Sequence, residues 1–175
     1  AELSPPHEFP EFAIFDTQFA LRTARLLISK AKSPDMPALA AIWADADVRR
    51  YLGGSISRDE ALARVDSRVA AGQLCAVRLY GNDRIIGCVV LEEVRPLELE
   101  VSYLFNVDAW GYGYATESVS AVVEKIRDRF NGYEVVAKTQ AANLPSRRLL
   151  SRLGFRMEQE IIEFGEPQAI FRQRL

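Results

Sequence analysis

Two glycines alternate with bulky aromatic residues in the segment VDAWGYGYATES, which occupies residues 107–118. The residues before it alternate like a strand, and those after it have the apolar spacing of a helix. A loop in this position presents unpaired backbone N–H groups at the positive end of the helix dipole, where anions bind. Because Gly111 and Gly113 have no side chains, the main chain there could approach phosphate oxygens closely. The pattern predicts a phosphate-binding loop, with an ordinary tight turn as the alternative.

Two common nucleotide-binding motifs fit this loop poorly. The P-loop requires a lysine directly after its last glycine, and no lysine follows Gly113. The dinucleotide motif G-x-G-x-x-G requires a third glycine, but Thr116 stands at that position. The preceding strand also follows a hairpin and does not open a parallel unit. The loop therefore indicates a different class of phosphate ligand.

The composition limits which other catalytic centres the chain could build. His7 is the only histidine, so neither a histidine-based dyad nor a zinc site with several histidines is expected, and no metal is predicted. Cys75 and Cys88 lie in separate strand-like runs without C-x-x-C spacing. We expect buried free thiols, and a disulfide is the open alternative. A carboxylate acting through water is the remaining class of general base.

The bulk properties are those of one soluble globular domain. Of the 175 residues, 49% are hydrophobic and 26% are charged, which is ordinary for such proteins. The net charge of -2 argues against a nucleic-acid binder that works through a broad basic surface. No apolar run has the length of a membrane span, and the first residues lack the pattern of a signal peptide. We expect a cytoplasmic protein that binds neither membrane nor nucleic acid.

Strand-like and helix-like segments follow one another in a mixed order. Strands are expected at residues 25–29, 74–80, 84–93, 97–107, 133–139, 155–164 and 168–175, and helices within 33–52, 57–72, 115–130 and 143–154. Ser33, Ser57 and Asn143 are the expected N-caps. Leu99, Val101, Tyr103 and Phe105 share one face of the strand before the glycine loop. The order predicts a single α/β (α+β) domain over residues 21–175, with a mixed, mostly antiparallel twisted sheet of about seven strands and helices on both faces.

The first 20 residues form an aromatic, proline-rich arm. They contain four of the nine phenylalanines, namely Phe9, Phe12, Phe15 and Phe19. Each ring can bury roughly 150 Å² or more, so the arm is expected to dock on apolar surface. We expect it to cover its own domain. The alternative is that it covers a twofold partner, which would make the protein a homodimer.

The segment WGYGYATES resembles the pyrophosphate-binding loop of the GNAT acyltransferase superfamily, whose pattern is Gln/Arg-x-x-Gly-x-Gly/Ala. It is most similar to the ribosomal-protein-alanine N-acetyltransferase branch, where a W-G-x-G-Y-A-T-E run is common. LRTARLLISK is similar to the opening strand of that branch, ELEVSYLFNVDAWGYGYATE to its central strand and loop, and NLPSRRLLSRLGF to its N-x-x-S…G-F helix. The likeness spans residues 21–175 in order. Asp108 departs from the usual Gln or Arg, but such loops bind mainly through backbone N–H groups.

This resemblance implies a GNAT-like N-acetyltransferase that moves an acetyl group from acetyl-CoA to a primary amine by direct attack in a ternary complex. It assigns the backbone of three strand-end residues to the pantetheine arm, namely Leu104, Phe105 and Val107. It assigns the phosphate cradle to the loop and the first helical turn, namely Gly111, Tyr112, Gly113, Tyr114, Ala115 and Thr116. Asn143 and Arg148 are implied as further cofactor contacts, and the alternatives are a plain helix cap and a solvated helix face.

Two residues are candidates for catalysis under the same resemblance. Ser146 lies one turn into its helix, close to where the CoA thiol would sit, so it could protonate or polarise the leaving thiolate. Glu100 could act as the base through water, and the alternative is a charge pair on the sheet face that it shares with Glu98. Without a function, Ser146 would be an ordinary polar residue of a first helical turn.

The acceptor amine stays open between a protein N-terminus, a polyamine, an amino acid and an aminoglycoside. An α-amine with a pKa near 8 is about one-tenth neutral at pH 7, whereas a lysine near 10.4 is neutral in only about one molecule in a few thousand. A weak base therefore favours an α-amine. A larger donor such as succinyl-CoA, and a non-catalytic acyl-CoA-binding module, are the open alternatives.

Overall fold

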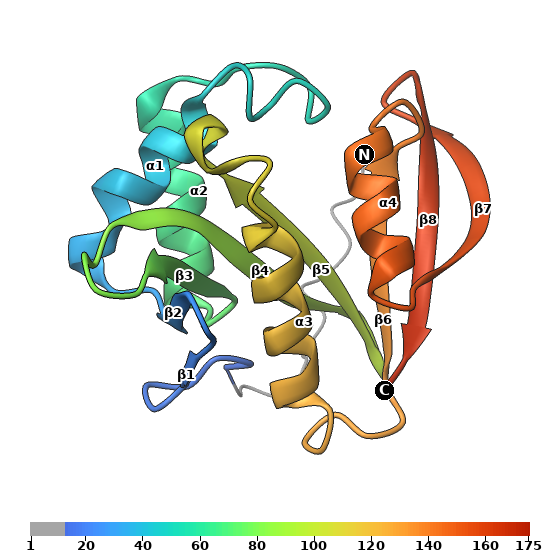
Figure 1. Cartoon of the computed structure of the whole chain (residues 1–175). Helices are drawn as coiled ribbons and strands as arrows, with labels where there is room; N and C mark the ends of the chain where they lie inside the picture. Colours follow the sequence, from blue (N-terminus) through green and yellow to red (C-terminus); the bar gives the residue numbers. More distant parts are fainter. Residues whose placement is uncertain (1–12) are drawn as a thin grey trace, which may run out of the picture.

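The computed structural model describes residues 13–175, which form one eight-stranded sheet with helices on both faces (Figure 1). The strands are β1 Ala20–Arg22, β2 Leu26–Lys30, β3 Leu74–Leu79, β4 Ile85–Arg95, β5 Glu98–Phe105, β6 Glu134–Gln140, β7 Arg156–Glu163 and β8 Glu166–Arg174. The helices are α1 Met36–Ala44, α2 Arg58–Ala70, α3 Tyr114–Ile126 and α4 Leu144–Arg152, with short 3-10 helices at Ser33–Asp35 and Val107–Ala109. The predicted fold class is confirmed.

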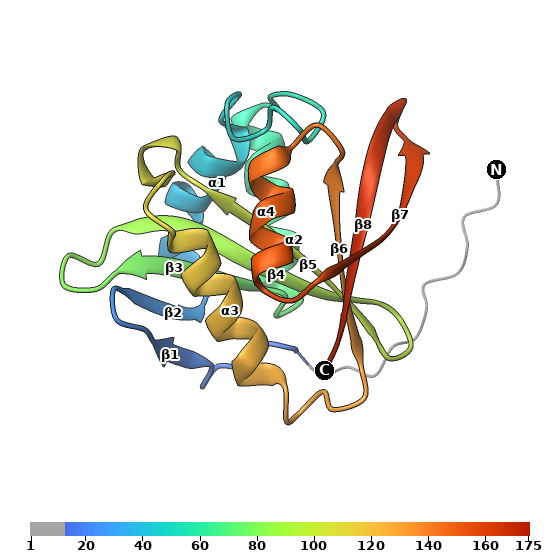
Figure 2. The ribbon, with the colours of Figure 1, turned by 45° about the vertical axis from the view of Figure 1, so that its right-hand side comes forward.

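The strands lie in the order β1-β2-β3-β4-β5-β6-β8-β7, and every neighbouring pair is antiparallel except β5 with β6. Helices α1 and α2 cover one face of the sheet, and α3 and α4 cover the other (Figures 1 and 2). The face of α3 that carries Val119, Val122, Val123 and Ile126 is buried, as the periodicity predicts. No helix within residues 13–175 is long and apolar enough to cross a bilayer.

Two local predictions need correction. The sheet has an eighth strand, β1, whose three residues are too few to give a sequence pattern. Ser33 is not the N-cap of a long helix, because it begins a 3-10 turn and α1 starts only at Met36. α1 then ends at Ala44, and the carboxylate of Asp45 accepts hydrogen bonds from the backbone N–H groups of Asp47 and Val48. Such side-chain contacts compete with helix continuation.

The two other predicted caps are confirmed. The Ser57 side chain accepts from the N–H of Glu60 at 3.1 Å and starts α2. The Asn143 side chain accepts from the N–H of Ser146 at 3.3 Å and starts α4. Each cap satisfies a donor that the first helical turn leaves without an intrahelical partner. The second cap fixes the position of Ser146.

The central strands separate from one another partway along their length. β5 pairs with β4 over all of its residues, but it pairs with β6 only over Glu98–Glu100. Beyond Glu100, β6 continues alongside β8, so one edge of β5 has no strand partner up to Phe105. Both views show β5 and β6 diverging toward the end of the sheet where α3 and α4 begin (Figures 1 and 2).

An arginine holds the paired end of these strands together. Arg172 on β8 contacts Glu98 of β5 at 2.8 Å and Glu134 of β6 at 2.7 Å through Nη1. Its Nε contacts Glu158 of β7 at 2.7 Å. These hydrogen bonds, that to Glu158 first, raise the pKa of Arg172. One side chain thus links four strands at the closed end of the split.

The cysteines are buried free thiols in separate strands, so the disulfide alternative is wrong. Burial raises the pKa of Cys75 well above its ordinary value and that of Cys88 to about 11. The indole N–H of Trp43 donates to the Cys88 sulfur at 3.4 Å. Both thiols therefore act as core residues that are poorly ionised at neutral pH.

Part of the predicted arm packs on the core of its own domain. Ile14 and Phe15 are buried, and the Phe19 ring lies 4.7 Å from the ring of Phe15. The backbone N–H of Phe15 donates to the carbonyl of Gly72 at 2.9 Å. Phe9 and Phe12 lie outside the described residues. The division of the chain at residue 20 and the alternative of a twofold partner stay predictions.

Phe15→Ala is expected to lower the free energy of unfolding by about 3–5 kcal/mol, because it removes a fully buried ring from the core. Phe164→Ala is the matched control, since that ring is 93% exposed and its loss is expected to change stability by less than about 0.5 kcal/mol. Urea denaturation measures both. A loss below about 1 kcal/mol for Phe15→Ala would show that this segment contributes little to the core.

Candidate active site

The glycine loop connects the open end of β5 to α3. Gly111 and Gly113 have φ values of 83° and 80°, in the left-handed region that favours glycine, and Gly113 is the N-cap of α3. The Trp110 indole donates to the carbonyl of Phe105 at 2.9 Å and ties the loop to the end of the strand. The rings of Tyr112 and Tyr114 stack at 5.6 Å. The glycines of AWGYGY thus occupy the two positions with positive φ, and the contacts of its aromatic side chains hold the loop in place.

The space above the two glycines is open. A Cβ atom at Gly111 would meet no atom within 4 Å, and one at Gly113 would meet only Nη2 of Arg25, at 3.6 Å. Within residues 13–175, the N–H groups from Gly111 to Thr116 donate to no acceptor. Accessible donors at a helix N-terminus suit a diphosphate. The loop therefore fits the pyrophosphate of CoA, and its role in binding stays a prediction.

Asp108, the departure from the family pattern, is paired with a cation. Arg84 Nη2 lies 2.5 Å from Asp108 Oδ2, and both side chains are at least half exposed. The ion pair offsets the negative charge that Asp108 would otherwise place beside a bound phosphate. Its contribution is modest because solvent screens it.

Ser146 is joined to Tyr103, which the sequence pattern had placed only on the apolar face of its strand. The hydroxyls of Tyr103 on β5 and Ser146 on α4 lie 2.6 Å apart and share a hydrogen bond. The contact connects β5 to the helix that follows β6, next to the point where the two strands diverge. Burial raises the pKa of Tyr103, with the Ser146 hydrogen bond acting in the opposite direction, so the phenol stays protonated at neutral pH.

A signal for Tyr103 was present in the sequence. It is the one residue with a hydroxyl among the apolar residues that share its face of the strand. A buried tyrosine hydroxyl usually finds a hydrogen-bond partner. The partner itself lies 43 residues away, at a distance along the chain that no local pattern predicts.

The structure gives Glu98 and Glu100, the two glutamates of β5, different surroundings. Glu98 is committed to Arg172, as described above. Glu100 lies on the face of β5 opposite to Tyr103, and within the described chain it makes no ion pair or side-chain hydrogen bond. Burial raises the pKa of Glu100, while surrounding charges act in both directions, with Lys138 and Arg68 lowering it and Glu92 and Glu163 raising it. Of the two, Glu100 is the carboxylate that is available as a base.

The remaining predicted contacts divide into backbone and surface positions. The side chains of Leu104 and Phe105 pack into the core, which leaves only their backbone for a ligand, and Val107 is exposed. Asn143 caps α4, and Arg148 is exposed on that helix. Arg147, its neighbour, donates to the carbonyl of Ala141 at 2.9 Å and so has a structural role. No three metal-ligating side chains are grouped in the part of the chain that the structure describes.

Comparison with known proteins places these features in one family. A family model described as an acetyltransferase (GNAT) domain matches residues 25–156. An uncharacterized N-acetyltransferase of Bacillus subtilis, YnaD, is 28% identical over 141 residues, which cover 79% of this chain and 83% of that protein.

Solved structures share the fold. An acetyltransferase of the GNAT family from Bacillus anthracis has a TM-score of 0.81 at 22% identity, covering 89% of this chain and 98% of that one. RimL, a ribosomal L7/L12 alpha-N-protein acetyltransferase, has a TM-score of 0.74 at 16% identity, with coverages of 87% and 92%. An acetyltransferase of Salmonella typhimurium, YncA, solved with its cofactor acetyl-CoA, has a TM-score of 0.68 at 19% identity, with coverages of 85% and 93%. The resemblance inferred from the sequence is confirmed, and the chain belongs to the GNAT acetyltransferase family.

Proposed function

We propose that the protein transfers an acetyl group from acetyl-CoA to a primary amine, and that an α-amine is the preferred acceptor. The observation that carries this proposal is the unpaired edge of β5 beyond Glu100, which has the glycine loop at its end and Ser146 beside it. An extended pantetheine can bind such an edge as an added strand would. The presence of acetyl-CoA in a structure of the same fold supports the choice of donor.

The donor is assigned to the α3 and α4 side of the split. The backbone of Leu104, Phe105 and Val107 would bind the pantetheine arm, and the loop from Gly111 to Thr116 would bind the pyrophosphate. The thioester then lies near the Tyr103–Ser146 pair. As the C–S bond breaks, Ser146 donates its proton to the leaving sulfur and takes a proton back from solvent water, and Tyr103 holds the Ser146 hydroxyl in position.

The acceptor is assigned to the Glu100 side of β5. The neutral amine nitrogen forms a bond with the thioester carbonyl carbon, and its surplus proton passes through water to Glu100. Because burial raises the pKa of Glu100, it is a stronger base than an exposed glutamate. Carboxylates are ordinarily weaker bases than histidine, so an amine that is partly neutral at pH 7 suits the site better than a lysine side chain.

Acetyl-CoA is expected to raise the melting temperature of the wild-type protein, by about 5–10 °C at one hundred times its Kd. Gly113→Val is expected to abolish this shift, because a β-branched residue is strained at a φ of 80° and would distort the cradle. Gly81→Val is the control, since Gly81 also has a positive φ and open space around it but lies in the β3–β4 turn. An acetyl-CoA shift of wild-type size in a folded Gly113→Val protein would refute the cradle.

Ser146→Ala is expected to reduce kcat about 10²–10⁴-fold while changing the KM for acetyl-CoA by less than about threefold, because the hydroxyl acts on the leaving thiolate. Ser151→Ala is the control, since Ser151 is an exposed residue of the same helix. Release of free CoA is measured with a thiol reagent across a panel of α-amines, lysine side chains and polyamines. The two buried cysteines of the protein add little background.

The same panel separates the alternative functions. Turnover of succinyl-CoA in place of acetyl-CoA would identify a larger donor. Tight binding of acetyl-CoA without CoA release for any amine would identify a binding module and refute the enzyme. A kcat that Ser146→Ala leaves unchanged would reduce Ser146 to a residue of the helix.

The pH dependence of kcat tests the base. The carboxylate form of Glu100 is the active one, and its raised pKa means that this form appears at higher pH than for an exposed glutamate. We therefore expect kcat to rise with pH through that raised pKa, and Glu100→Gln to lower kcat and remove this rise. Glu98→Gln is expected to keep the rise, because Glu98 is paired with Arg172. A wild-type pH profile in Glu100→Gln would exclude Glu100 as the base.

A further inference from the structure

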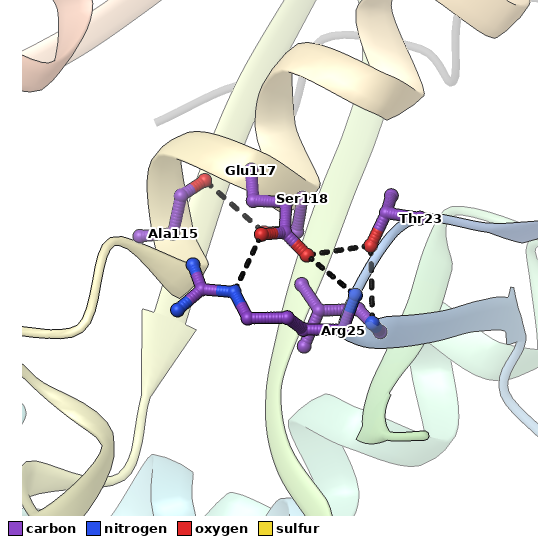
Figure 3. A network of polar contacts seen from close by, with 6 residues as sticks. Thr23, Arg25, Ala115, Glu117 and Ser118 are labelled. Atoms are coloured by element: carbon purple, nitrogen blue, oxygen red, sulfur yellow. Dashed lines mark hydrogen bonds and ion pairs between the residues drawn. The ribbon is translucent and has the colours of Figure 1, made fainter.

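An arginine from outside the glycine loop lies beside the first turn of α3, where the loop ends (Figure 3). Arg25, directly before β2, donates from Nε to Oε1 of Glu117 at 2.8 Å. Its guanidinium lies over the Tyr114 ring, 4.5 Å from the centroid, and Nη2 would be 3.6 Å from a Cβ atom at Gly113. The guanidinium is therefore at the entrance to α3, next to the proposed phosphate cradle.

A small network fixes this arginine in place. The Thr23 hydroxyl donates to Glu117 Oε2 at 2.6 Å and accepts from the N–H of Leu26 at 3.0 Å. The backbone N–H of Arg25 also donates to Glu117 Oε2, at 3.3 Å. Partial burial acts to raise the pKa of Glu117, but the hydrogen bonds from Thr23 and Arg25 outweigh it and hold that pKa below its ordinary value. Glu117 is thus a carboxylate that joins the β1–β2 turn to the first turn of α3.

The ion pair with Glu117 leaves most of the guanidinium donors unused. An arginine has five N–H donors, and Arg25 gives one of them, on Nε, to Glu117. Its two Nη groups donate to no acceptor within residues 13–175, and the side chain is 44% exposed. Arginine and carboxylate often pair through two parallel hydrogen bonds, which would have used one Nη group as well. The single contact at Nε leaves the Nη groups available to a ligand.

The loop itself has no cation to offer a phosphate. Residues 107–118 contain Asp108 and Glu117 but no lysine or arginine. Asp108 occupies the position where the family pattern has Gln or Arg, and it is paired with Arg84. We propose that Arg25 binds a phosphate group of CoA and supplies, from the β1–β2 turn, the positive charge that the loop lacks. This inference rests on the proposed function, because it assigns a further residue to the same donor site.

The test is isothermal titration of CoA into the wild type, Arg25→Gln and Arg127→Gln. Arg25→Gln is expected to weaken CoA binding about tenfold or more, because a charge-assisted hydrogen bond is lost. Arg127→Gln is the matched control: Arg127 also pairs through Nε with a glutamate of α3, but at the far end of the helix, and CoA affinity is expected to stay unchanged. Dephospho-CoA identifies the phosphate: an equal loss with both ligands indicates the pyrophosphate, and a loss with CoA alone indicates the 3′-phosphate.

Two further variants separate binding from support of the fold. Arg25→Lys keeps the positive charge but lacks the paired N–H groups of a guanidinium, and it is expected to lose less CoA affinity than Arg25→Gln. Glu117→Gln breaks the network but keeps the Arg25 charge, so it is expected to lower the melting temperature with a smaller effect on CoA binding. Wild-type affinity in Arg25→Gln, or a loss that Glu117→Gln reproduces in full, would overturn the role of Arg25. If the wild type binds no CoA, the proposed function fails and this inference fails with it.

Discussion

The structure depends on the unequal pairing of β5 with its two neighbours. β4 satisfies one edge of β5 along its whole length, whereas β6 satisfies the other edge only over Glu98–Glu100. Backbone N–H and C=O groups need hydrogen-bond partners, so an edge left open inside a sheet needs water or a ligand to complete it. Arg172 closes the other end of the split by contacting carboxylates on β5, β6 and β7. The gap between β5 and β6 is therefore closed at the end that Arg172 holds together and open at the end near the glycine loop.

The residues proposed for catalysis lie on the two sides of β5. Strand alternation places Tyr103 toward Ser146 of α4 and Glu100 toward the opposite side, so β5 lies between the proposed acid, Ser146, and the proposed base, Glu100. The glycine loop continues from the end of the same strand, and Trp110 anchors it there. A single element thus sets the relative positions of the proposed acid, base and phosphate cradle.

Local signals in the sequence predicted much of this arrangement. The caps Ser57 and Asn143, the buried face of α3 and the strand–glycine–helix order follow from short-range patterns, and the structure confirms them. Features that depend on long-range contact were missed. β1 is three residues long and is recognisable only by its pairing with β2. The Tyr103–Ser146 hydrogen bond joins residues 43 apart, and the Arg25–Glu117 ion pair joins residues 92 apart.

The central claim is that acetyl-CoA binds along the free edge of β5 and at the loop that follows. Amide hydrogen exchange, followed by peptide with and without saturating acetyl-CoA, measures this directly. The account predicts slower exchange in two stretches, residues 101–107 and 111–116, and little change in the β3–β4 turn around Gly81. Protection that appears elsewhere and leaves both stretches unchanged would contradict it.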